Sequence, residues 1–116
     1  MAGMRTSLKV VGALSAAYAC HRLYTAHSRR YNFSDRTIVI TGGARGLGLV
    51  MARQLADEGA RLAICSRHDD EVQRAVGELR CFGVPVLGKF CDVTDPTQFD
   101  DFLSQVRREL GPIDVL

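Results

Sequence analysis

The sequence is poor in the features that mark metal-binding, disulfide-rich and nucleic-acid-binding proteins. Its four cysteines, Cys20, Cys65, Cys81 and Cys91, form no Cys-x-x-Cys pair. We therefore expect reduced, buried thiols in a cytosolic type of compartment, rather than disulfides or metal ligands. Residues 31–116 carry 10 basic and 13 acidic side chains, so this part of the chain has no excess of positive charge that would bind a nucleic acid.

The first 30 residues lack acidic side chains altogether and carry the remaining 5 of the 15 basic ones. Their uncharged run, residues 10–20, would span about 16 Å as a helix, against a hydrocarbon core of about 30 Å. Three interpretations are open. The helical segment contacts a membrane surface through residues 8–24 of an otherwise cytoplasmic protein, it is a presequence for import into an organelle, or it docks on its own domain or on a partner.

A glycine-rich stretch stands between an apolar run, residues 37–40, and an apolar-periodic run, residues 47–58. It reads Thr41-Gly42-Gly43-Ala44-Arg45-Gly46-Leu47-Gly48. No Lys-Ser/Thr pair follows the last glycine, which excludes the phosphate loop of the nucleoside triphosphatases. A strand, a sharp glycine turn and a helix N-terminus, which offers unpaired N–H groups and a partial positive charge, together predict a phosphate-binding site.

Apolar runs and periodic segments alternate along residues 31–116, which predicts strands alternating with helices. Strands are expected at residues 36–41, 61–66 and 84–91, and a fourth begins at residues 113–116. This alternation is typical of a parallel sheet with helices on both faces. We therefore predict an α/β fold, a doubly wound parallel sheet of the Rossmann type with strand order 3-2-1-4, preceded by an N-terminal helical segment.

The helices between these strands are indicated by their ends and by their apolar faces. The first is expected to pack on the sheet through four side chains, Leu47, Val50, Met51 and Leu55. Asp69 or Asp70 is expected to cap the second helix. Asp95 is expected to cap the third, with Gln98 placed for a capping box.

The fourth predicted strand ends with the chain, at Leu116. We therefore expect an incomplete sheet that belongs to the front part of a longer protein. The predicted organisation is a basic and apolar segment, residues 1–30, followed by the N-terminal part of a dinucleotide-binding domain, residues 31–116.

The end of the second predicted strand carries the residues that distinguish between dinucleotides. NAD sites place Asp or Glu there for the ribose hydroxyls, whereas this chain has Ser66 and Arg67. A carboxylate would repel a 2′-phosphate, but an arginine binds it with charge-assisted hydrogen bonds. Arg45 adds a second positive charge nearby. We therefore predict NADP rather than NAD as the cofactor; the alternative is that both arginines are solvated surface charges.

Residues 33–116 resemble the short-chain dehydrogenase/reductase family. The resemblance rests on the loop pattern Thr-Gly-x-x-x-Gly-x-Gly, on Ser66-Arg67, on Asp92-Val93 and on the run from Gly111 to Leu116. It implies that Asp92 accepts a hydrogen bond from the adenine amine; the alternative is that Asp92 caps the following turn. The cofactor-binding residues that it implies are Thr41, Gly42, Arg45, Gly46, Leu47, Gly48, Ser66, Arg67, Asp92 and Val93.

The resemblance also implies a reaction, hydride transfer between NADP(H) and a small carbonyl or alcohol substrate. The family uses a Tyr-x-x-x-Lys pair with a serine and an asparagine. The sequence has no such pair and its only lysines are Lys9 and Lys89, so no catalytic residue is named. We expect the cofactor-binding part of an oxidoreductase that forms homo-oligomers at full length. The alternative is a non-catalytic dinucleotide-binding regulator or a membrane-tethered interaction module.

Overall fold

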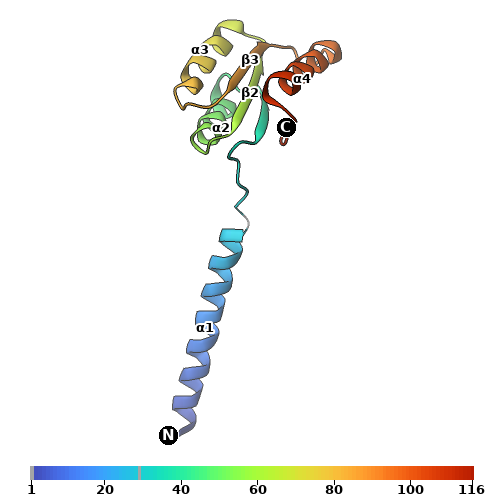
Figure 1. Ribbon diagram of the computed structural model, residues 1–116. Coiled ribbons are helices and arrows are strands. Elements are labelled where there is room, and N and C mark those ends of the chain that lie inside the picture. The colour runs from blue at the N-terminus through green and yellow to red at the C-terminus, as the bar shows by residue number, and fades with distance from the viewer. Residues whose placement is uncertain (1, 29) are drawn as a thin grey trace. The chain divides into compact units, whose positions relative to one another are not determined.

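A computed structural model describes residues 2–28 and 30–116 of the chain. It contains two compact units, residues 1–32 and residues 33–116. The first unit contains one helix, α1 (Ala2–Ser28), and the second contains the remaining helices and all the strands, as Figure 1 shows. The two units are described separately below.

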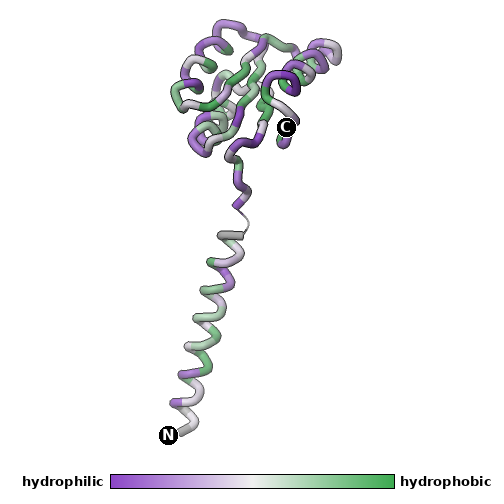
Figure 2. Tube along the Cα trace, viewed as in Figure 1, coloured by the Kyte–Doolittle hydropathy of each residue, from purple (hydrophilic) through white to green (hydrophobic). Residues whose placement is uncertain are grey.

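Helix α1 carries the apolar run between more polar turns (Figure 2). Its large apolar side chains are exposed and are distributed around the helix rather than along one face: Leu8, Val10, Val11, Leu14, Tyr18, Leu23 and Tyr24. Within the described residues, we find no helix whose length and apolar character together suffice to cross a membrane.

The second unit is built on a parallel sheet of three strands, β1 (Thr37–Thr41), β2 (Arg61–Ser66) and β3 (Val86–Phe90). Strand β2 lies in the middle, with Thr37 opposite Arg61 and Leu62 opposite Val86. Crossovers α2 (Gly46–Asp57) and α3 (Asp69–Arg80) connect the strands, and α4 (Pro96–Leu110) follows β3. The predicted doubly wound α/β fold is confirmed.

Helices cover both faces of the sheet, α2 and α3 on one face and α4 on the other (Figure 1). Because successive strand residues point to opposite faces, each face has its own core. Ile38, Ile40 and Leu62 pack with α2 and α3. Val39 and Ala63 pack with α4. Burial of both faces explains why these strands are continuous apolar runs rather than alternating ones.

Helix α2 packs on the sheet through a different face from the one predicted. Its buried residues are Ala52 and Ala56, and Leu49 and Leu55 pack partly against the same core. The predicted inner residues Leu47, Val50 and Met51 are 76%, 44% and 45% exposed. Two small alanines allow a close approach of the helix to the strands, which the larger side chains would prevent.

The two helix N-caps predicted from the sequence differ in their outcome. Helix α3 begins after His68, which makes no side-chain capping bond, so Asp69 and Asp70 lie inside the first turn rather than capping it. There their negative charges interact favourably with the partial positive charge at the start of the helix. Asp95 does cap α4, accepting from the N–H groups of residues 97 and 98. The reciprocal bond of a capping box is absent, because Gln98 accepts from the N–H of Asp92 instead.

The segment after α4 returns to β1 and extends the sheet by one bridge. Val115 pairs in parallel with Ile38, and the N–H of Val39 donates to the Val115 carbonyl at 2.9 Å. This placement agrees with the predicted strand order 3-2-1-4, although residues 113–116 form only this bridge and no longer strand. The third strand is also shorter than predicted.

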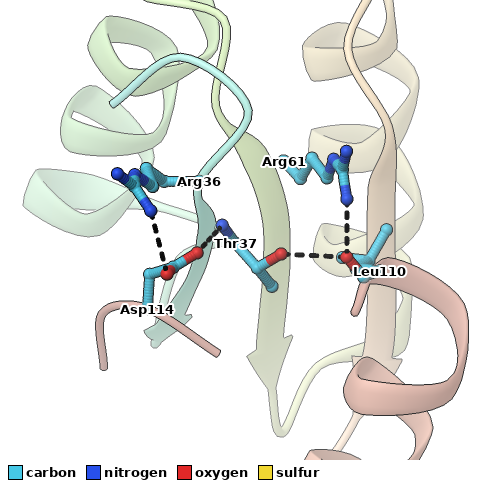
Figure 3. Close-up of polar contacts among 5 residues, drawn as sticks. All are labelled: Arg36, Thr37, Arg61, Leu110 and Asp114. Carbon is cyan, nitrogen blue, oxygen red and sulfur yellow. Dashed lines mark hydrogen bonds and ion pairs between the residues drawn. The ribbon is translucent and has the colours of Figure 1, made fainter. Parts of the chain in front are cut away.

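Thr37 ties the start of β1 to both ends of this returning segment (Figure 3). The side chain of Thr37 is buried, and its Oγ1 donates to the carbonyl of Leu110 at 2.9 Å. Its N–H donates to Oδ2 of Asp114 at 2.9 Å. Arg36 adds an ion pair to Asp114 at 3.6 Å, and Arg61 donates to the Leu110 carbonyl at 3.1 Å. One buried threonine therefore fixes the end of α4 on the sheet.

We predict that Thr37→Val destabilises the folded unit by about 1 kcal/mol, because it removes a buried hydrogen bond at nearly constant side-chain volume. Thr97→Val, at an exposed position in the first turn of α4, is the matched control and is expected to stay within about 0.5 kcal/mol of wild type. Urea unfolding measures both free energies. Equal stabilities of the two variants would show that the Thr37 hydroxyl does not anchor α4.

Candidate functional site

The carboxyl ends of the three strands meet at one edge of the sheet, where the chain leaves each strand. A cavity of about 400 Å³ opens at this edge. Open α/β sheets bind their ligands outside the carboxyl ends of the strands. The lining residues follow all three strands: Thr41, Gly42, Arg45, Cys65, Ser66, Arg67, His68, Cys91, Asp92, Val93 and Thr94.

Glycines fix the shape of the turn between β1 and α2. Gly42 and Gly46 adopt left-handed conformations, with φ of +68° and +57°, and face open space. Gly43 and Gly48 have no room for a side chain. A Cβ at Gly43 would lie 2.7 Å from Cγ2 of Ile64, and one at Gly48 would collide with the carbonyl oxygen of Gly42. The turn thus holds α2 against the end of β1 and lets a ligand approach the backbone closely.

Helix α2 directs its positive end into this turn without a side-chain cap. The N-cap residue, Arg45, is extended and makes no side-chain capping bond, and the first turn contains no acidic residue. The first intrahelical bond runs from the N–H of Leu49 to the carbonyl of Arg45, at 3.3 Å. The N–H groups of residues 46–48 precede it and have no partner within the helix. They can therefore bind an anion such as a phosphate.

Two arginines make the cavity electropositive. Arg67 follows β2 and is exposed, and Arg45 has a side chain that is 70% exposed. Ser66 occupies the strand end, where its Oγ accepts a hydrogen bond from the N–H of His68 at 3.2 Å. Among the lining residues, Asp92 alone is acidic. The cavity therefore suits a ligand with several negative charges.

Asp92 forms the boundary of the cavity after β3. Its Oδ1 accepts hydrogen bonds from Oγ1 of Thr94 at 2.7 Å and from the N–H of Thr94 at 3.0 Å. These bonds, with a smaller contribution from the charge of Arg67, lower the pKa of Asp92 below its ordinary value. The ionised carboxylate therefore caps this turn through one oxygen. Its other oxygen is directed to no donor among the described residues, which leaves an acceptor for a ligand.

Two cysteines that we had expected only to pack the core also line the cavity. Cys65, within β2, and Cys91, directly after β3, are both buried. Burial raises the pKa of Cys65 to about 11, with a further contribution from Cys91, and burial also raises the pKa of Cys91. Both thiols are therefore protonated at neutral pH. The expectation of buried thiols is wrong for Cys20 and Cys81, which are exposed.

The cavity collects seven of the predicted cofactor residues, Thr41, Gly42, Arg45, Ser66, Arg67, Asp92 and Val93. Gly46, Leu47 and Gly48 lie outside it. Leu47 and Gly48 line a neighbouring groove of about 830 Å³ beside β1, and Gly46 lines a groove between α2 and α3. Sequence reasoning did not name His68 and Thr94. His68 directly follows Arg67 and Thr94 directly follows Val93, so extending each predicted group of site residues by one position would have included them.

Comparison with known proteins finds relatives along most of the second unit. Residues 36–116 match a family model described as short chain dehydrogenase. The 2,3-dihydro-2,3-dihydroxybenzoate dehydrogenase of Bacillus subtilis is 35% identical over 77 residues, which are 66% of this chain and 30% of that protein.

Two solved structures show the same fold with bound dinucleotides. An NAD+-bound xylitol dehydrogenase has a TM-score of 0.70 at 28% identity. The match covers 73% of this chain and 33% of the dehydrogenase chain. L-Sorbose reductase from Gluconobacter frateurii, complexed with NADPH and L-sorbose, has a TM-score of 0.69 at 34% identity. The match covers 73% of this chain and 34% of the reductase chain. The chain therefore spans about a third of the length of these relatives.

The thiols of the chain are expected to react in two classes. At pH 7.5, an alkylating reagent should modify the exposed Cys20 and Cys81 quickly. Cys65 and Cys91 should react slowly, because they are buried and because the thiolate is the reactive form. Pulse alkylation followed by peptide mass spectrometry measures the four rates, with denatured chain as the control in which all four react alike. Modification of Cys65 as fast as Cys81 in the folded chain would contradict this structure of the cavity.

Proposed function

Because this chain belongs to the short-chain dehydrogenase family, as its sequence predicted, we propose that it holds NADP in the cavity at the ends of β1, β2 and β3. The observation that carries the proposal is the pair Arg45 and Arg67 at a cavity whose β2 end has Ser66 in place of a carboxylate. In the whole protein, the bound nicotinamide would supply or accept a hydride in the oxidation or reduction of a small alcohol or carbonyl substrate.

The residues present fit such a dinucleotide. Gly42 and Gly46 face open space, and the N–H groups of residues 46–48 have no partner within α2. These groups would bind the pyrophosphate. Asp92 has a carboxylate oxygen available for the adenine amine, and Val93 lines the same part of the cavity. The chain's own residues therefore account for the binding and orientation of the adenosine half.

The preference for NADP rests on charge. The related structures contain either NAD+ or NADPH, so the fold alone is compatible with both. An acidic residue after β2 would bind the ribose hydroxyls of NAD and repel a 2′-phosphate. Here Ser66 stands at the strand end, and Arg67 follows it and is exposed beside the cavity. A guanidinium offers paired donors to a phosphate, and this favours NADP.

Replacing Arg67 by Asp is expected to weaken NADP binding by roughly 1.5–3 kcal/mol, the range for hydrogen bonds to charged groups. NAD binding is expected not to weaken, because a carboxylate there can accept from the ribose hydroxyls. Arg108→Asp, an exposed position in the last turn of α4, makes the same change of charge away from the cavity and controls for long-range electrostatics. Calorimetric titration with both dinucleotides measures the dissociation constants. Tighter binding of NAD than of NADP by the unmodified chain would refute the proposed preference.

We further propose that α1 binds the surface of anionic membranes. The first 30 residues carry five basic and no acidic side chains, and each basic residue near an anionic surface contributes about 1 kcal/mol. The exposed apolar side chains around the helix, among them Val11 and Leu14, would enter the interfacial region while Lys9 and Arg22 contact the headgroups.

Co-sedimentation with vesicles rich in anionic lipid tests this proposal. The unmodified chain is expected to sediment with them, and less at high salt because screening weakens the attraction. The double variant Val11→Asp, Leu14→Asp should remain in solution. Thr97→Asp with Ser104→Asp, two exposed positions of α4, adds the same charge elsewhere and should sediment like wild type. Identical sedimentation of the two double variants would exclude α1 as the membrane-binding element.

A further inference from the structure

Arg45 lies between two cavities. It lines the cavity at the strand ends, and it also lines a groove of about 480 Å³ between α2 and α3. In this structure its guanidinium points into the groove, where Nη1 lies 3.5 Å from Oε1 of Glu71. An arginine that borders both spaces has two alternative partners, the carboxylate on one side and an anion in the strand-end cavity on the other.

Glu71 is an incompletely paired carboxylate. It lies in the first turn of α3 with a side chain that is 22% exposed. Its Oε2 is buried without a hydrogen-bond partner among the described residues, and the contact of its Oε1 with Arg45 is long. A partly buried carboxylate with so few donors attracts any nearby cation. Arg45 is the cation that reaches it in this structure.

We propose that Glu71 limits the affinity for NADP by competing with the 2′-phosphate for Arg45. This inference rests on the proposed function. Binding of a 2′-phosphate would draw the guanidinium out of the groove and break its ion pair with Glu71, whereas NAD has no group that requires this movement. Glu71 does not line the strand-end cavity and acts through Arg45. It is a specificity-determining positioning residue, not a contact of the cofactor.

The neighbouring ion pair provides a matched control. Arg53 of α2 pairs with Glu78 of α3 across the same groove. Neither residue lines the strand-end cavity. Glu78→Gln therefore removes one negative charge and one contact between α2 and α3, as Glu71→Gln does, but it leaves Arg45 and its partner unchanged.

The test is a set of calorimetric titrations of the full chain with NADP and with NAD. An ion pair with an exposed arginine contributes at most about a factor of five. Because Arg45 is such an arginine, Glu71→Gln is expected to tighten NADP binding about two- to fivefold and to leave NAD binding unchanged. Glu71→Ala, a second neutral variant, should act in the same direction, and Glu78→Gln should leave both constants unchanged. In the Arg45→Ala background, Glu71→Gln should lose most of its effect, since the competition needs Arg45.

The titrations test the competition by Glu71 separately from the proposed preference for NADP. An unchanged or weaker affinity of Glu71→Gln for NADP would overturn the inference, and so would an equal gain in the presence and in the absence of Arg45. Tighter binding of NAD than of NADP by wild type would contradict the proposed cofactor preference. In that case, the effect of Glu71 would still be measured by comparing the NADP dissociation constants of wild type and Glu71→Gln. Failure of the chain to bind either dinucleotide would overturn both.

Discussion

The close approach of α2 to the end of β1 is the constraint on which the site depends. Gly48 lies against the backbone of Gly42, and Gly43 lies against Ile64 of β2, with no space for a Cβ at either position. A side chain there would push α2 away from the sheet. The helix would then no longer direct its unpaired N–H groups toward the cavity, and Arg45 would move with it. The proposed phosphate site therefore depends on backbone packing, because this packing positions the N–H groups and the charge of Arg45.

The fold separates the parts that stabilise it from the parts that bind. At the amino end of β1, Thr37 connects the end of α4 through a buried hydrogen bond and Asp114 through a partly buried one (Figure 3). At the carboxyl ends, the turns carry exposed side chains such as Arg67, and their polar groups are only partly paired. Loops on a rigid scaffold commonly carry function. Changes at the binding edge can therefore alter ligand choice with little cost to the two cores.

Local signals in the sequence were sufficient to predict the order of the strands and helices and most of the residues that line the strand-end cavity. The apolar run of β2 and the Asp95-Pro96 start of α4 depend on neighbouring residues, and both were predicted. The inner face of α2 was not, because periodicity favoured Met51 over Ala52, while the close packing imposed by Gly48 needs small residues. The pair Arg45–Glu71 joins residues 26 positions apart, and such a contact is set by the packing of two helices rather than by spacing.

The central claim is that the glycine turn and the two arginines form one site for a 2′-phosphorylated adenosine. Amide chemical-shift mapping of the isotope-labelled chain during titration with 2′,5′-ADP tests it most directly. The account predicts that the largest changes fall on the glycine turn and the N-terminus of α2, residues 42–48, and on residues 66–68 and 92–94 of the strand-end cavity. The largest changes along the groove beside β1, around Met51 and Val115, or no changes at saturating ligand, would contradict it.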